Sequence, residues 1–182
     1  MQAGRRAAER RPAPPCPIGR AADLLGDRWT LLILRNATIG MRRFDDFKSD
    51  LGIADNILSA RLNRLVEAGV LTKVPYRDGG RTRYEYRLTE SGADVLPLLH
   101  ALSRWGQRYT EPAQPADPMR IVHLACGHPT DDDRVCDHCG EPLARDDEGW
   151  LRPWRASTPL PLAPPVTAGD HGQDGDEPPG PA

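Results

Sequence analysis

One stretch, residues 44–88, constrains the fold of this chain more than any other. It reads FDDFKSDLGIADNILSARLNRLVEAGVLTKVPYRDGGRTRYEYRL. A short helical segment precedes Gly52, and a second, amphipathic segment ends at Gly69. Two strand-like runs then flank a Gly-Gly turn that is rich in arginine. This order predicts two helices joined by a tight turn and followed by a β-hairpin, the arrangement of a helix-turn-helix that carries a β-wing.

The second of these helices has two chemically distinct faces. Leu58, Leu62 and Leu65 recur at i, i+4 and i+7, which is typical of a stripe packed on a core. Small and amide side chains fill the opposite face, and an asparagine can bond the edge of adenine bidentately. Arginines beside that face can reach phosphates, which set the register on duplex DNA. The predicted DNA contacts on this helix are Asn56, Ser59, Ala60, Arg61, Asn63 and Arg64, although a solvated polar face would look similar.

The hairpin that follows has the composition of a wing. Its flanking runs alternate β-favouring residues, and Asp78-Gly79-Gly80 supplies the positive φ values that a tight hairpin turn requires. Arginines cluster at the predicted tip, where they can contact phosphates or the minor groove. A hairpin kept soluble by its charge is the alternative reading. The candidate contacts are Arg77, Arg81 and Arg83.

Helices are also predicted on both sides of this region. Ile18, Ala22 and Leu25 space a first helix that Gly26 closes, and Asp27 can cap the next helix by accepting from its free N–H groups. The expected fold class is therefore mainly α with a β-wing (α+β). A last helix carries an apolar stripe longer than a small domain needs, which suggests a dimer interface. Its members are Val95, Leu98, Leu99, Leu102 and Trp105.

Several of these motifs together resemble a known family. The segments CPIGRAADLLGDRWTLLILRNATIGMRRFDDF, GIADNILSARLNRLVEAGVL, RYEYRLTESG and LLHALSRWG are similar to the HxlR-type winged helix-turn-helix transcriptional regulators, continuously over residues 16–109. The resemblance implies a homodimer, assembled through the N-terminal and C-terminal helices. It implies that the dimer binds a pseudo-palindromic operator, most often as a repressor. It places the recognition helix at residues 55–68 and the wing at residues 76–84.

Cys16 occupies the Cys-Pro position of that family, and some relatives use this cysteine to sense oxidants or electrophiles. Sensing needs a thiolate stabilised by nearby cations, and Arg20 lies one helical turn away. A redox- or electrophile-sensing regulator is therefore an alternative function. A small residue that packs the dimer arm is the simpler explanation of the same cysteine.

The chain departs from the family by a C-terminal extension that contains HLACGHPTDDDRVCDHCGEPL. Cys136 and Cys139 form a CxxCG knuckle, and His123 and Cys126 have the same form upstream with His replacing the first Cys. Two such knuckles can hold zinc tetrahedrally through one nitrogen and three sulfurs. Four protein ligands would make the site closed and structural. His128 is the rival fourth ligand, and three free cysteines or a decayed zinc ribbon are the other readings.

Composition divides the chain of 182 residues into five parts. We predict a disordered basic N-terminus at 1–15, the DNA-binding domain at 16–110, a Pro-rich linker at 111–118, a zinc-ribbon-like segment at 119–145 and a low-complexity tail at 146–182. Residues 16–110 carry a net charge of +4 and residues 111–182 a net charge of −9. A positive face can therefore exist on an acidic protein.

The same sequence argues against other classes of protein. No apolar run approaches the length needed to span a membrane, and the N-terminus has no secretory h-region. Three clustered cysteines do not form a disulfide framework, so a reduced, cytoplasmic protein is expected. No nucleophile–base pair, phosphate loop or open metal site indicates an enzyme. A winged helix that binds a protein partner instead of DNA is the remaining alternative.

Overall fold

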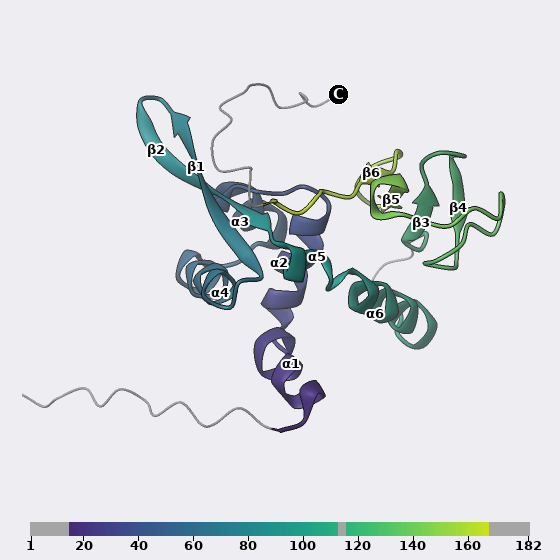
Figure 1. Ribbon diagram of the computed structural model, residues 1–182, viewed down its shortest axis with the longest axis horizontal. Coiled ribbons are helices and arrows are strands. Elements are labelled where there is room, and N and C mark those ends of the chain that lie inside the picture. The colour runs from purple at the N-terminus through teal and green to yellow at the C-terminus, as the bar shows by residue number, and fades with distance from the viewer. Residues whose placement is uncertain (1–14, 113–115, 168–182) are drawn as a thin grey trace, which may run out of the picture.

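The computed structural model describes residues 15–112 and 116–167, so residues 1–14 of the predicted basic N-terminus, residues 113–115 of the predicted linker and the end of the predicted tail lie outside the described residues. Within the described part of the chain, no helix is both long and apolar enough to cross a bilayer. The first half has the predicted element order (Figure 1): α1 (Pro17–Leu25), α2 (Arg28–Thr38), α3 (Phe44–Leu51), α4 (Asp55–Glu67), β1 (Leu71–Asp78), β2 (Arg81–Leu88), α5 (Glu90–Ala93) and α6 (Leu96–Tyr109).

Local signals explain where the first helices begin and end. The Asp27 carboxylate accepts hydrogen bonds from the N–H groups of Trp29 (3.0 Å) and Thr30 (3.1 Å), so it caps α2 as predicted. Gly52 ends α3 with a φ of 60°, a left-handed conformation that a Cβ disfavours, and the chain then turns into α4. The helices α2, α3 and α4 enclose one apolar core, to which Phe47, Leu58 and Leu62 contribute fully buried side chains.

The wing is a two-stranded antiparallel hairpin that projects from the helices (Figure 1). Its register runs from Leu71 opposite Leu88 to Asp78 opposite Arg81, and Gly79 and Gly80 form the turn with φ values of 54° and 80°. The N–H of Tyr86 donates to the carbonyl of Arg42 at 2.7 Å. This bond fixes the base of the wing to the loop between α2 and α3.

The extension folds into a second, four-stranded antiparallel sheet beyond α6 (Figure 1). Its strands are β3 (Arg120–His123), β4 (His128–Thr130), β5 (Glu148–Leu151) and β6 (Leu160–Pro161), in the spatial order β4-β3-β5-β6, and the short 3-10 helix η1 (Arg145–Asp147) precedes β5. The sheet therefore includes residues on both sides of position 146, where we expected a low-complexity tail to begin. That boundary is wrong for residues 148–166.

The sheet packs against α6 and forms a second apolar core with it. Leu99 of α6 contacts a buried cluster that contains Ile121, Trp150 and Leu162. The buried pair of His100 and Glu148 joins the two parts at 2.6 Å, and the indole N–H of Trp150 donates to the same Glu148 oxygen at 2.8 Å. The extension is thus docked on the helical domain, which the predicted Pro-rich linker did not suggest.

Residues 162–166, called here the C-terminal strap, run back across the helical domain. The N–H of Leu162 donates to Glu148, that of Ala163 to the carbonyl of Thr38 (2.7 Å) and that of Val166 to the carbonyl of Leu88 (2.8 Å). The strap therefore connects the extension to the end of α2 and to the base of the wing. Backbone bonds of this kind need no particular side chain, so the sequence carries little sign of them.

Candidate functional site

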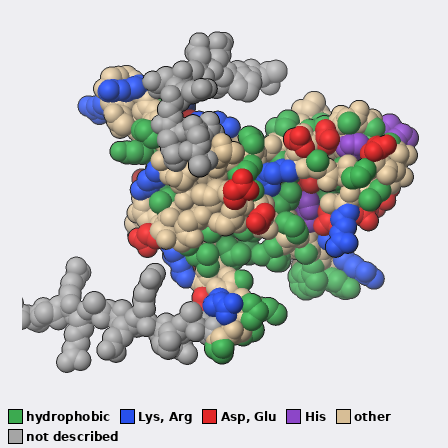
Figure 2. Space-filling model, viewed as in Figure 1, with side chains coloured by type: hydrophobic (Ala, Val, Ile, Leu, Met, Phe, Trp, Pro, Cys, Tyr) green, Lys and Arg blue, Asp and Glu red, His purple; other side chains and the backbone are tan. Residues whose placement is uncertain are grey.

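The predicted DNA-facing surface consists of the outer face of α4 and the tip of the wing. Asn56, Ser59 and Ala60 are exposed on α4, opposite its buried leucines. Arg77 and Arg81 are exposed at the wing tip, where Figure 2 shows clustered Lys and Arg side chains. Among the described residues, the side chains of Asn56, Ser59, Arg77 and Arg81 form no hydrogen bond or ion pair, so they are available to a partner.

Two of the arginines predicted on α4 instead bind within the protein. Arg61 donates from Nε and Nη2 to the two carboxylate oxygens of Asp27, at 2.8 and 2.9 Å. Arg64 donates from Nη2 to the backbone carbonyl of Asp23. Both guanidinium groups therefore tie α4 to the start of α2 and the end of α1. The sequence suggested phosphate contacts here because it does not show which acids lie near α4 in space.

Two more predicted contacts have partners of their own. The Asn63 amide oxygen accepts from Lys73 Nζ at 3.0 Å. Arg83 forms ion pairs with Asp78 at 3.0 Å and with Asp45 at 3.5 Å. These groups are exposed, and exposed contacts between charged or polar side chains contribute little free energy to folding. The Lys73 contact of Asn63 and the ion pairs of Arg83 can therefore open at small cost when DNA approaches. Asn63 and Arg83 remain candidates, whereas Arg61 is primarily a positioning residue for α4.

The Asp27 carboxylate both caps α2 and binds Arg61 of α4, so its protonation in acid should weaken both contacts. The Arg61 hydrogen bond, with smaller contributions from the N–H groups of Thr30 and Trp29, outweighs desolvation and lowers the pKa of Asp27 to about 2. The ionised Asp27 carboxylate therefore stabilises the folded protein fully above the unfolded-state pKa of about 3.9, and this stabilisation is lost as pH falls towards about 2. We expect Asp27→Asn to lower the free energy of unfolding at neutral pH and to matter less in acid.

Urea unfolding of the wild type and Asp27→Asn checks this expectation, at neutral pH and at the lowest pH where both remain folded. Asp23→Asn is the matched control, because it removes a carboxylate from the neighbouring α1, whereas the cap of α2 is made by Asp27. A stability difference that stays constant across the acid range would show that the Asp27 charge is not responsible.

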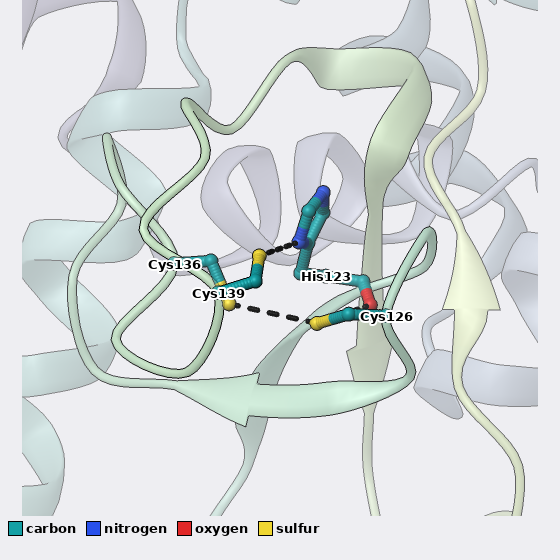
Figure 3. Close-up of side chains that lie close together, drawn as sticks. All are labelled: His123, Cys126, Cys136 and Cys139. Atoms are coloured by element: carbon teal, nitrogen blue, oxygen red, sulfur yellow. Dashed lines mark hydrogen bonds between the residues drawn. The ribbon is translucent and has the colours of Figure 1, made fainter.

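The extension brings His123, Cys126, Cys136 and Cys139 together (Figure 3). Their four ligand atoms lie within 4.8 Å of one another. The Sγ atoms of Cys126 and Cys136 are 3.7 Å apart, and Cys139 Sγ lies 3.2 Å from His123 Nδ1. Ligand sulfurs on a tetrahedral zinc ion are about 3.8 Å apart, given Zn–S bonds of about 2.3 Å. The cluster could therefore hold one metal ion with little rearrangement.

The two halves of this cluster are built by the same backbone turn. Gly127 and Gly140 have φ values of 72° and 76°, and their N–H groups donate to His123 and Cys136 respectively, both at 2.8 Å. A side chain at either glycine would strain the turn. Hydrogen bonds from backbone N–H groups, first that of Cys139, lower the pKa of the Cys136 thiol to about 6. A thiolate, the form that ligates metal, is thus favoured there.

The rival ligand His128 lies outside the cluster. Its Nδ1 is 2.8 Å from the carbonyl oxygen of Cys126, and its ring stacks on that of His138 with centroids 3.5 Å apart.

Cys16 is remote from the cluster in sequence and is exposed at the start of α1, where the Arg20 guanidinium donates to the carbonyl of Pro15 at 2.6 Å. Sensing by Cys16 stays a prediction.

An exposed helix beside an arginine-tipped wing defines a helix-turn-helix fold of the DNA-binding type. Residues 24–114 match the HxlR-like helix-turn-helix family. The HTH-type transcriptional regulator Rv3095 of Mycobacterium tuberculosis is 44% identical over 126 residues, which cover 69% of this chain and 78% of that protein. The chain therefore belongs to the HxlR-like helix-turn-helix family and is a transcriptional regulator.

Two further comparisons agree with this assignment. The HTH-type transcriptional regulator sll1512 of Synechocystis is 33% identical over 97 residues, covering 53% of this chain and 71% of that protein. The crystal structure of PA1607, described as a candidate transcription factor, is 40% identical with a TM-score of 0.58. The match covers 78% of this chain and 96% of the PA1607 chain, so the similarity extends beyond residues 24–114, which match the family.

Proposed function

We propose that this regulator binds a pseudo-palindromic operator as a homodimer and represses transcription. The observation that carries the proposal is the joint exposure of Asn56 and Ser59 on α4 and of Arg81 on the wing, all without internal partners among the described residues. Small and amide groups on α4 would contact base edges, while the wing arginines would contact phosphates. Two copies of the site would bind two half-sites.

The apolar stripe of α6 supports the dimer. Leu99 faces the extension, but Leu98, Leu102 and Trp105 are 41%, 42% and 59% exposed, and Tyr109 continues the same face. Figure 2 shows hydrophobic side chains gathered over α6 and over the nearby end of the molecule where α1 lies. An apolar surface of this kind favours contact with another protein. A second copy of the chain presents the same stripe and would cover it symmetrically.

Two substitutions separate base contact from phosphate contact. We expect Arg81→Ala to weaken binding to all DNA sequences about equally and to reduce the salt slope by about 1, because it removes one phosphate contact. We expect Asn56→Ala to reduce discrimination between the operator and a scrambled site by about 1–3 kcal/mol, because it removes a bidentate base contact. Electrophoretic shifts with DNA from upstream of the gene, at several salt concentrations, measure both effects.

Arg120→Ala is the control for these variants, since it removes an exposed arginine from the extension and should leave both quantities unchanged. Wild-type affinity in both Arg81→Ala and Asn56→Ala would refute the assignment of this surface. If the wild type binds no duplex DNA at all, the alternative function is favoured, in which the same surface binds a protein partner.

We also propose that His123, Cys126, Cys136 and Cys139 bind one structural Zn²⁺. The ligand set and its near-tetrahedral spacing support zinc, and four protein ligands leave no position for a catalytic water. The extension has short strands and a small apolar core, so a metal ion would supply much of its stability. The zinc ion would in this way keep the extension folded against α6.

A further inference from the structure

Two arginines from distant parts of the chain meet at one carboxylate, at the seam between the helical domain and the extension, and a third, buried arginine belongs to the same turn as one of them. Arg35 of α2 places Nη2 3.0 Å from Oδ2 of Asp50, and Arg155, which follows β5, places Nη2 3.1 Å from Oδ1. The Asn36 amide also donates to Asp50 Oδ2, at 2.8 Å. Asp50 is therefore already well supplied with donors, and its side chain is only 7% exposed.

The third guanidinium, that of Arg152, has no such partner. Arg152 is 4% exposed, and its Nε is buried without a hydrogen-bond acceptor in the described structure. Burial is the main cause that lowers the pKa of both Arg152 and Arg35, and Asp50 is the acid that acts on both. Three guanidinium groups and one carboxylate leave the cluster with two surplus positive charges.

The buried charge of Arg152 is unfavourable unless an ion of opposite sign accompanies it. Guanidinium groups are planar forks whose N–H pairs match the oxygens of phosphate, and several of them together favour an anion of more than one charge. The side chains of Arg35 and Arg155 are 28% and 49% exposed, so the cluster opens to solvent, whereas Arg152 lies at its buried end.

We propose that Arg35, Arg152 and Arg155, called here the arginine cluster, form a binding site for a phosphate group. The group can come from free phosphate or a phosphomonoester, or from the backbone of bound duplex DNA, since Asp50 belongs to α3 of the helix-turn-helix. A phosphate bound there would join α2 to the segment after β5. It would therefore strengthen the attachment of the extension to the helical domain.

Titration of inorganic phosphate into the full-length, zinc-loaded protein at constant ionic strength tests the site. Trp154 lies between two of the arginines in sequence and is 52% exposed, so its fluorescence reports binding, and thermal unfolding gives an independent readout. We expect saturable binding that Arg152→Gln and Arg155→Gln each weaken by about tenfold or more, because each removes charged hydrogen-bond donors. Arg134→Gln, at an exposed arginine elsewhere in the extension, should bind as the wild type does.

Asp50→Asn separates anion binding from a purely structural role of the same residues. Removing the competing carboxylate should tighten phosphate binding, whereas a role limited to holding the seam together predicts that this variant is only less stable. Arg155→Gln covers the case in which Arg152→Gln does not fold, since Arg155 is half exposed.

Duplex DNA distinguishes the two sources of phosphate. If the group belongs to free phosphate, Arg155→Gln binds DNA normally in phosphate-free buffer. If it belongs to the DNA backbone, free phosphate has little effect, and Arg155→Gln lowers duplex affinity and the salt slope by about 1. The proposal is overturned if neither phosphate nor DNA distinguishes the Arg152 and Arg155 variants from Arg134→Gln.

Discussion

Cys136→Ser is expected to release the metal ion and unfold the extension. Wild-type protein should contain about one zinc per chain, and the variant much less, because serine is a poor ligand for this ion. Residues 119–166 should then lose protection from protease and from amide exchange, since structural zinc sites contribute apparent binding energies of about 10–16 kcal/mol to folding. The core of α2, α3 and α4 should stay folded, because its apolar cluster is separate from that of the extension.

Metal analysis together with hydrogen exchange measures this result, and three further variants make it specific. His123→Ala should lose the metal as Cys136→Ser does. His128→Ala and Cys16→Ser should keep it, because neither residue belongs to the cluster. Metal-free wild-type protein with residues 119–166 still protected would contradict the zinc proposal.

Leu102→Asp is expected to convert the proposed dimer into a monomer. The substitution would place an unpaired carboxylate in an apolar interface, and burying such a charge costs far more than the contact can offset. Affinity for the operator should fall steeply, because two half-sites are no longer held by one particle. Sedimentation velocity gives the oligomeric state, and electrophoretic shifts give the affinity.

Val135→Asp is a matched control for this variant. Val135 is 43% exposed, close to the 42% of Leu102, but it lies in the extension and does not belong to the α6 stripe. It should leave the dimer intact. A dimer that survives Leu102→Asp would mean that the stripe is not the interface, and a monomeric wild type would refute the dimer proposal itself.

The features that sequence predicted correctly are those with local causes. The capping of α2 by Asp27 and the Gly-Gly turn of the wing each depend on residues a few positions apart. The two turns that carry the proposed metal ligands are equally local, because each ends in a glycine that needs a positive φ. The sequence also predicted that the two turns lie close together, because each turn supplies only two of the four ligands that a tetrahedral zinc site needs.

The features that sequence missed depend on contacts between distant segments. Arg61 and Asp27 are 34 residues apart, so nothing near Arg61 indicated that it would hold α4 to α2. The strands after residue 146 are short and lie among prolines and acids, and they show no periodic pattern. Trp150 is 1% exposed because α6 and β3 cover it, and neither lies near it in the sequence.

The C-terminal strap has a consequence for how the protein is made. Its donors at Ala163 and Val166 bond to Thr38 and Leu88, which leave the ribosome much earlier. The helix-turn-helix core can close during synthesis, whereas the strap can bond to the end of α2 and to the base of the wing only after residue 166 has emerged. A nascent chain that stops before residue 160 would therefore lack Leu162 of the second apolar core and both strap bonds, even though every residue of the proposed DNA-binding surface has already been synthesised.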